Sequence, residues 1–352
     1  MRNAPVLALC FMILLSSCTT AQKETAPAQT GPPAITESYI TRWDQNDNID
    51  SPAVWHGPGN RHWLIATAKT SDALVVYNAV DGHELHRVGG PGNGPGQFER
   101  PNGIAVVDDH VLVVERDNHR VQVLKLPELT SIGSFGSESL VRPYGLYAES
   151  SGNTWTVFVT DNYETADERI PDPGALGERV KKFTVSLTND RLESTLDISF
   201  GATTGKGVLY VVESIWGDPV SRRLCIADEH ETERCVKVYT YDGEFTGLTA
   251  ASGLIENECE GIVLYERGNG GYWVVTDQGR QSNVFYVLDR DSFSLLGSFT
   301  GSHTANTDGI ALSNSPLGPF SSGAFFAVHD DGGVSAFSWQ TIADSLGLAL
   351  SH

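Results

Sequence analysis

Short apolar runs separated by polar, glycine-containing clusters recur six times along the chain. Each repeat opens with a polar residue followed by a small residue or proline, continues through two apolar runs and closes on a polar cluster. Apolar runs bounded by turn residues in this way predict β-strands. The six openings are Ser51-Pro52, Asn102-Gly103, Tyr144-Gly145, Glu213-Ser214, Glu260-Gly261 and Asp308-Gly309.

A third β-rich run follows every closing cluster, and most repeats then supply a fourth, such as residues 295–300. Four strands per repeat, at a spacing of roughly 40–50 residues, are typical of propeller blades. The sequence therefore predicts an all-β fold, a six-bladed β-propeller of four-stranded antiparallel blades. Residues 39–43 are expected to add a strand to the last blade, residues 339–346 to form a helix, and residues 167–177 to form an inserted loop.

The N-terminal segment has the pattern of a targeting signal. Arg2 precedes an apolar run at residues 6–15, and the sequence Leu-Ser-Ser then leads to Cys18. This resembles a bacterial lipoprotein signal, so residues 1–17 are expected to be a signal peptide and Cys18 the lipidated residue. Residues 18–36 are rich in Ala, Thr and Pro and are expected to form a flexible tether before a propeller at residues 37–350. The protein is therefore expected to be lipid-anchored in the cell envelope, on the periplasmic face of an outer membrane or at the cell surface.

Composition narrows the choice of partners. A formal net charge of -20 argues against a nucleic-acid or anionic-membrane surface, since both need clustered Lys and Arg. With Cys10 in the signal and Cys18 assigned to lipid, three cysteines remain. Cys225 and Cys235 flank a polar segment and could face each other across a hairpin, which would leave Cys259 unpaired. A monomer is expected.

Three acidic residues spaced two apart, Glu256, Glu258 and Glu260, lead into the apolar run at 262–265. Alternate residues of an extended chain share a face, so the stretch alone is either a solvated acidic turn or a metal site. The repeat favours the metal site over the solvated turn, because the opening residue of each propeller blade lies near the central channel. Glu213, Glu260 and Asp308 should converge there, with Glu229 and Glu258 near the same rim, whereas Glu256 gains no such support. Converging carboxylates need a cation, and their oxygens suit calcium.

Cationic side chains near the same rim indicate an anionic substrate. Lys69 and Arg116 follow closing positions of the first two repeats, and Arg can hold a phosphate through two hydrogen bonds. Calcium would neutralise the carboxylates, attract phosphate oxygens and activate a water for attack.

Several motifs resemble known families. The stretch at 88–106 followed by RDNHRVQV resembles an NHL repeat, itself a propeller blade. DSPAVW at Asp50, ECEGIVLY with GYWVVTDQG, NTDGIAL at Asn306 and WQTIADSLG at Trp339 resemble the β-propeller phytases, which are calcium-dependent phosphatases of inositol phosphates. That resemblance implies a phosphomonoesterase acting on phytate or a related phosphate monoester through calcium-activated water.

The phytase resemblance also implies roles for individual residues. Glu229 would hold the attacking water, Glu213, Lys69 and Arg116 would complete the catalytic set, and Asn102 would bind substrate. Asn162 stands where the family has a phosphate-binding lysine, and either Lys181 or Lys182 could reach in to replace it, with Lys181 taken as the candidate. The residues implied as calcium ligands are Asp50, Tyr144, Glu213, Glu229, Glu258, Glu260 and Asp308.

Two other functions remain open at this point. NHL-like propellers also serve as non-enzymatic binding modules, and this chain could be one on the cell envelope. A lactonase-like hydrolase with a single calcium ion in the channel is the third possibility, since a fold alone does not fix its chemistry.

Overall fold

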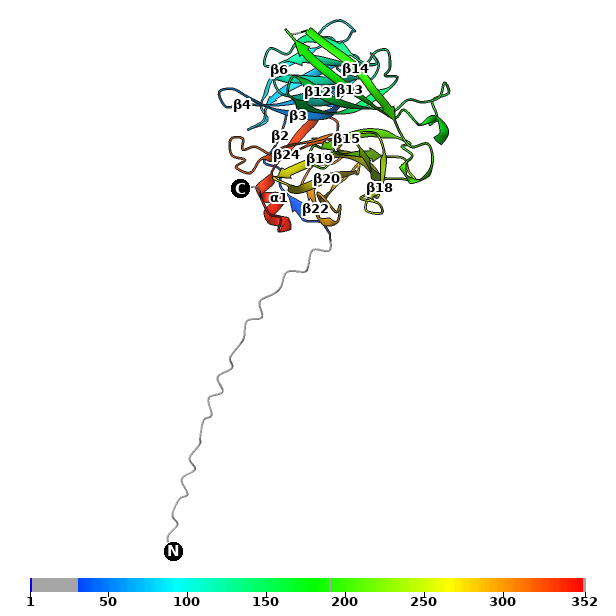
Figure 1. Cartoon of the computed structure of the whole chain (residues 1–352). Helices are drawn as coiled ribbons and strands as arrows, with labels where there is room; N and C mark the ends of the chain where they lie inside the picture. The colour runs from blue at the N-terminus through cyan, green and yellow to red at the C-terminus, as the bar shows by residue number, and fades with distance from the viewer. Residues whose placement is uncertain (2–30, 190, 351–352) are drawn as a thin grey trace. The chain divides into compact units, whose positions relative to one another are not determined.

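The computed structural model describes residues 1, 31–189 and 191–350, and the strands within them form six sheets arranged as propeller blades. In Figure 1 the strands of blades 2 and 3 lie at the opposite end of the propeller from those of blade 5. The predicted six-bladed, all-β fold is confirmed. The expected signal peptide at 1–17 and the lipidation site at Cys18 lie outside the described residues, apart from Met1.

Each blade is built on an antiparallel meander that runs outward from the channel, and blades 5 and 6 each take their outermost strand from the N-terminal segment. Blade 1 contains β3 (Ile49–Gly57), β4 (Arg61–Ala68), β5 (Ala73–Asn78) and β6 (Glu84–Gly89); blade 2 contains β7 (Pro101–Val107), β8 (His110–Glu115), β9 (Arg120–Lys125) and β10 (Thr130–Phe135); blade 3 contains β11 (Pro143–Ser151), β12 (Thr154–Asp161), β13 (Val180–Thr188) and β14 (Arg191–Phe200). Blade 4 contains β15 (Val212–Asp218), β16 (Arg223–Asp228), β17 (Cys235–Thr240) and β18 (Phe245–Ala250); blade 5 contains β19 (Glu258–Arg267), β20 (Gly270–Gln278), β21 (Val284–Asp289) and β22 (Leu295–Gly301); blade 6 contains β23 (Ile310–Ser313), β24 (Ala324–His329) and β25 (Gly333–Ser338).

The N-terminal part of the propeller closes the ring. Strand β2 (Tyr39–Ile40) pairs antiparallel with β25 and so supplies the fourth strand of blade 6, as the sequence predicts. Strand β1 (Ala34–Ile35) pairs in parallel with β22 of blade 5. Residues 34 and 35 are therefore structured, although the sequence places them in a tether that runs to residue 36.

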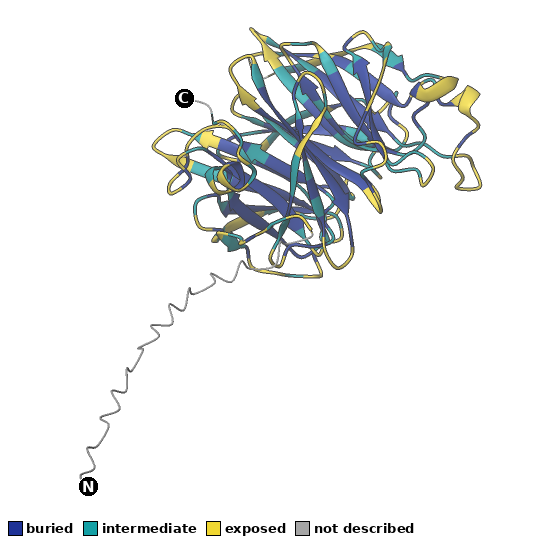
Figure 2. Ribbon diagram, turned by 90° about the horizontal axis from the view of Figure 1, so that it is seen from below, coloured by how far each residue is buried: buried dark blue, intermediate teal, exposed yellow. Residues whose placement is uncertain are grey.

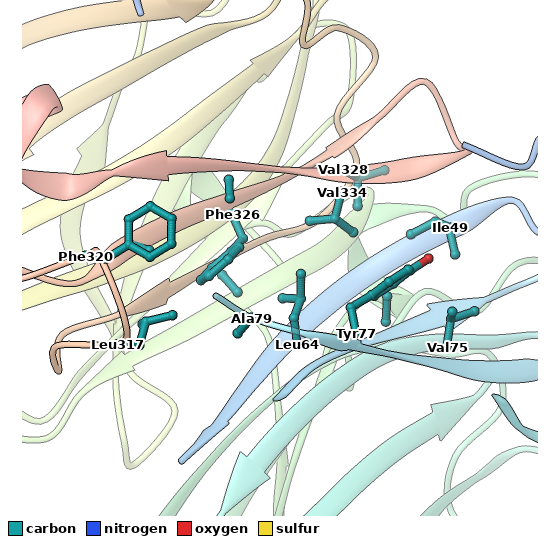
Figure 3. Close-up of a cluster of buried hydrophobic side chains, with 14 of the residues drawn as sticks. Ile49, Leu64, Val75, Tyr77, Ala79, Leu317, Phe320, Phe326, Val328 and Val334 are labelled. Atoms are coloured by element: carbon teal, nitrogen blue, oxygen red, sulfur yellow. The ribbon is translucent and has the colours of Figure 1, made fainter. Parts of the chain in front are cut away.

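Buried apolar side chains gather between neighbouring blades. Six hydrophobic clusters account for the six interfaces of the described ring, and each combines residues of two adjacent blades. Figure 3 shows the cluster between blades 1 and 6, where Leu64 and Tyr77 face Phe326 and Phe320. Because burial of apolar surface favours folding, this contact between the first and last blades stabilises the closed ring. Exposed residues concentrate in the outer strands and loops (Figure 2).

The remaining elements are short. Helix α1 (Trp339–Leu346) occupies the predicted helical segment and buries Trp339 and Ile342 against blades 5 and 6. The predicted insertion lies between β12 and β13 and contains the turn η1 (Pro173–Ala175), whereas η2 (Gly205–Gly207) precedes blade 4. Among the described residues, no helix has the length and apolar character needed to cross a membrane.

The hairpin pairing expected for Cys225 and Cys235 is wrong. Both residues lie in neighbouring strands, but the β16–β17 register places Cys225 opposite Val238 and Cys235 opposite Asp228. All three described cysteines are buried and free, and Cys225 and Cys259 pack in the cluster between blades 4 and 5.

Candidate functional site

A β-bulge occurs at the opening of five inner strands and aims the opening side chains at the channel mouth. The pairing of β3 with β4, for example, skips from Ile49 to Pro52, which leaves Asp50 and Ser51 as the bulged residues. The same shift frames Asn102, Tyr144, Glu213 and Glu260 in blades 2 to 5. Bulges re-aim side chains and commonly border active sites. In blades 2 to 5 the repeated polar-small dipeptide is therefore the sequence signature of this bulge, whereas in blade 1 the bulged pair Asp50-Ser51 begins one residue before the predicted opening Ser51-Pro52.

The small residue of each dipeptide allows adjacent inner strands to approach closely. A Cβ on Gly145 would lie 2.1 Å from the backbone oxygen of Glu213, and one on Gly103 would lie 2.5 Å from that of Tyr144. Between blades 6 and 1, the amide of Gly309 donates a hydrogen bond to the Asp50 carbonyl at 2.9 Å. Tyr144, Glu213, Asp308 and Asp50 are thus each positioned by a glycine of the preceding blade, whereas Ser51 and Ser214 stand at the junctions before Asn102 and Glu260.

Three carboxylates from two blades meet at the mouth. Glu213 lies in the bulge of β15, Glu229 directly follows β16, and Glu260 lies in the bulge of β19. One oxygen from each lies within 4.8 Å of the others. Calcium binds oxygens at about 2.3–2.6 Å, so two of its ligands lie no more than about 5 Å apart. The spacing of this carboxylate trio matches a shared calcium ion.

The trio is electrostatically crowded. Burial raises the pKa of Glu213 to about 8, with Asp50 adding to the rise. Burial also raises the pKa of Glu229 and of Glu260 well above the usual range, and the neighbouring carboxylates, Glu213 first, raise both further. Desolvated like charges favour their protonated forms unless a cation compensates. The donor set therefore favours a cation at this position.

Unsatisfied polar atoms at the mouth give an independent test of whether an ion or substrate fits there. Oε1 of Glu229 is buried without a hydrogen-bond partner in the described structure, and so are both amide atoms of the fully buried Asn102. Buried polar atoms are normally hydrogen-bonded. The unpaired oxygens of Glu229 and Asn102 could therefore bind a cation or a polar ligand.

The carboxylates at the mouth form two groups, the trio and the pair Asp50 and Asp308, and Lys69 contacts the second group. Its Nζ lies 2.8 Å from Asp50 Oδ1 and 3.1 Å from Asp308 Oδ2, and its side chain is 9% exposed. Burial by itself would lower the pKa of Lys69, but these two aspartates outweigh that effect and raise it. The side-chain amide of Gln278 donates a hydrogen bond to the other oxygen of Asp308. Asp50 and Asp308 are thus neutralised by a cation of the chain, whereas no Lys or Arg among the described residues forms an ion pair with the trio.

The other predicted ligands lie around the trio. Tyr144 makes a side-chain hydrogen bond with Glu213, and burial raises the pKa of its hydroxyl well above the usual range, so it remains a neutral donor. Glu258 is exposed at the start of β19 and lies outside the trio, although its charge contributes to the raised pKa of Glu229. Glu256 is exposed, in agreement with its expected solvation.

Two predicted phosphate-binding cations are engaged elsewhere. Arg116 Nε lies 2.7 Å from Asp117 Oδ1. Lys181 is buried in β13, where its ammonium lies 3.4 Å from Asp161 and from Glu178. Asp161 in turn accepts the backbone amides of Val141 and Arg142. Lys181 therefore neutralises a buried carboxylate that holds a loop, and the structure does not bring it to the trio.

Equivalent positions of the repeat explain which residues reach the mouth. Asp228 closes β16 and accepts the amides of the preceding loop, as Asp161 does in blade 3, whereas the next residue, Glu229, joins the trio. Gln278 follows Asp277 in the same way and reaches Asp308. Sequence reasoning missed Gln278, although its place after a closing acid matches that of Glu229 and was the available signal.

Comparison with known proteins agrees with this fold. The sequence model of the NHL repeat matches residues 98–124, which span β7 to β9 of blade 2. A regucalcin of Agrobacterium tumefaciens, described as a calcium-binding protein, has 10% identity and a TM-score of 0.52 over 87% of this chain and 95% of its own. A gluconolactonase of Xanthomonas campestris has 13% identity and a TM-score of 0.54 over 87% of this chain and 94% of its own. No curated protein matches the chain.

These similarities establish an NHL-type blade and the propeller architecture. Identities this low show a shared fold and leave the activity to be argued from the site. None of the three findings supports the phytase resemblance in particular.

Proposed function

We propose that this protein is a calcium-dependent hydrolase of lactones or related carboxylic esters. The observation that carries the proposal is the convergence of Glu213, Glu229 and Glu260 within 4.8 Å at the channel mouth. Two solved propellers of similar fold support it, since one is described as calcium-binding and the other as a gluconolactonase.

The residues around the trio have separable tasks in this proposal. Glu213 and Glu260 would hold calcium, with Glu229 as the third ligand. Bound calcium would supply positive charge to polarise a carbonyl and to lower the pKa of a coordinated water. Asn102, with both amide atoms unpaired, can donate to and accept from substrate oxygens. Lys69, kept protonated by Asp50 and Asp308, adds a fixed positive charge for the negative charge that develops on a carbonyl oxygen.

A neutral ester fits this mouth better than a phosphate monoester. The three cations nominated from sequence, Lys69, Arg116 and Lys181, all lie in ion pairs with carboxylates of the chain. A phosphate dianion would have to compete with those carboxylates for the cations, whereas a neutral carbonyl group leaves the ion pairs intact.

A phosphomonoesterase of phytase type is the second candidate. The observation that favours it is Lys69, whose ammonium lies beside Asp308 at the same mouth. Displacement of Lys69 from its aspartates would provide one phosphate contact. A non-enzymatic binding propeller is the outcome if calcium binds and no substrate is hydrolysed.

One assay separates these functions. Protein beginning at residue 19 is incubated with a lactone panel, p-nitrophenyl phosphate and inositol hexakisphosphate, with calcium and with chelator. We expect lactone hydrolysis that requires calcium and falls about 100-fold in Glu229→Gln, because loss of a charged ligand weakens the ion that would polarise the carbonyl. Phosphate release alone would replace the first candidate by the second, and calcium binding without turnover would leave the binding propeller.

We also propose that the chain is a monomeric lipoprotein anchored through Cys18. The support is the N-terminal pattern described above. Metabolic labelling with a fatty acid should mark the wild-type protein and not Cys18→Ala, and unlabelled wild-type protein at the membrane would contradict the anchor.

A further inference from the structure

A polar cavity of about 660 Å³ borders the site on the side of blade 5. Its lining includes Glu258, two residues before Glu260 of the trio, and Gln278, which donates a hydrogen bond to Asp308. The cavity therefore adjoins both the trio and the pair formed by Asp50 and Asp308. Its volume lies within the range of about 300–1,000 Å³ typical of small-molecule sites.

Two arginines line this cavity without a carboxylate partner. Nε of Arg234 is buried and makes no hydrogen bond in the described structure, while its Nη1 donates to the backbone oxygen of Glu256 at 2.7 Å. Arg280 is exposed, and within the described part of the chain no carboxylate lies at ion-pair distance from it. Glu256 and Glu258 line the same cavity but pair with neither guanidinium.

Arg234 and Arg280 differ in this respect from several arginines elsewhere in the chain. The sequence has 44 Asp and Glu against 24 Lys and Arg, and Arg87, Arg116, Arg120 and Arg290 all lie in ion pairs. A guanidinium presents a rigid fork of donors that matches the two oxygens of a carboxylate or phosphate. A buried Nε without an acceptor also carries a desolvation cost, which a bound oxyanion would offset.

We infer that this cavity is a binding subsite for an oxyanion, a carboxylate or a phosphate, held by Arg234 and Arg280. The inference rests on the proposed function in one respect, since it assigns that oxyanion to a substituent of the substrate whose reacting bond lies at the trio. The neutral side chains of Gln278 and Gln281, which also line the cavity, supply further hydrogen-bonding groups. The substrate class that follows is an ester or lactone with an acidic group on its remote side.

Direct binding of two probes tests the subsite. Methyl phosphate and glutarate are titrated by calorimetry into the purified protein, both metal-free and calcium-loaded, and into Arg234→Gln, Arg280→Gln and Arg191→Gln. Arg191 lies exposed on the outer strand β14, paired with Glu193, so its variant removes one charge away from the cavity. We expect the wild type and Arg191→Gln to bind at least one probe alike, and each cavity variant to bind it roughly tenfold more weakly, as for loss of a charged hydrogen bond.

The probes also distinguish the two sources of the oxyanion. Preference for methyl phosphate identifies a phosphorylated substituent, and preference for glutarate identifies a carboxylate. The subsite is overturned if the wild type binds neither probe, or if Arg280→Gln binds as the wild type does. Because Arg280 is exposed, its variant is expected to fold even if Arg234→Gln does not. Probe binding requires no turnover, so a protein that binds probes and hydrolyses nothing would refute the proposed function alone.

Discussion

The ammonium nitrogen of Lys69 lies 2.8 Å from Oδ1 of Asp50. This buried ion pair lies at the channel mouth beside the trio of Glu213, Glu229 and Glu260 and does not include any of its members. Asp308 shares the same ammonium at 3.1 Å. Lys69 thus provides the positive charge that a second cation would otherwise supply. The structure therefore favours one calcium ion per chain, held by the trio.

Replacement of Lys69 by methionine should change the number of bound ions. Without the ammonium, Asp50 and Asp308 are left as unpaired buried charges, which should cost about 3–5 kcal/mol of unfolding free energy in calcium-free buffer. Calcium should recover part of this loss by binding between the two aspartates. Calorimetry should show one ion per wild-type chain and two per variant chain, and an unchanged count with unchanged stability would refute this role of Lys69.

The raised pKa values of the trio predict an unusual dependence of stability on pH. The pKa of Glu213 is about 8 in the folded protein, against an ordinary value of 4.5 for an exposed side chain. The folded state therefore holds this proton more tightly than the unfolded chain does. Its contribution to stability is fully present below about pH 4.5 and is lost as the pH rises to about 8.

Calcium should act in the opposite direction, because it binds the ionised carboxylates. Metal-free protein should melt at a lower temperature at pH 8 than at pH 6, and saturating calcium should raise the melting temperature more at pH 8. The variant Glu213→Gln should show a weaker pH dependence and a smaller calcium effect, while Glu256→Gln, an exposed neighbour of the site, should match the wild type. Equal calcium shifts at both pH values would argue against the trio as the ligand set.

The contact between Gly145 and Glu213 predicts that a methyl group at the blade junction will disturb the site. In Gly145→Ala the new Cβ would lie 2.1 Å from the Glu213 backbone oxygen, so the strands must separate. We expect a loss of about 1–3 kcal/mol in unfolding free energy and weaker calcium binding. Gly174→Ala is the control, since no atom lies within 4 Å of its added Cβ. Wild-type calcium affinity in Gly145→Ala would show that the glycine does not position Glu213.

The fold was predictable because its signals are local and repeated. Alternating apolar runs located the strands, and the polar-small dipeptide located the bulge at the start of the inner strand in blades 2 to 5. Once the repeats were aligned, the convergence of Glu213 and Glu260 followed from propeller geometry, and the structure brings these two together with Glu229.

The features that the sequence did not predict depended on contacts between residues distant in sequence. Lys181 resembled a phosphate ligand by position, yet it neutralises Asp161 across two strands of its own blade. Cys225 and Cys235 flank one hairpin, but a strand register that sequence does not specify separates them. Arg234 and Arg280 lie in different hairpins, so their common cavity emerged only from the folded structure.

The most direct test of the calcium site is a crystal structure of the protein grown with calcium. We expect one ion bound by oxygens of Glu213, Glu229 and Glu260, with Lys69 still paired to Asp50 and Asp308. An ion bound elsewhere in the channel, or a trio without an ion at saturating calcium, would contradict this expectation.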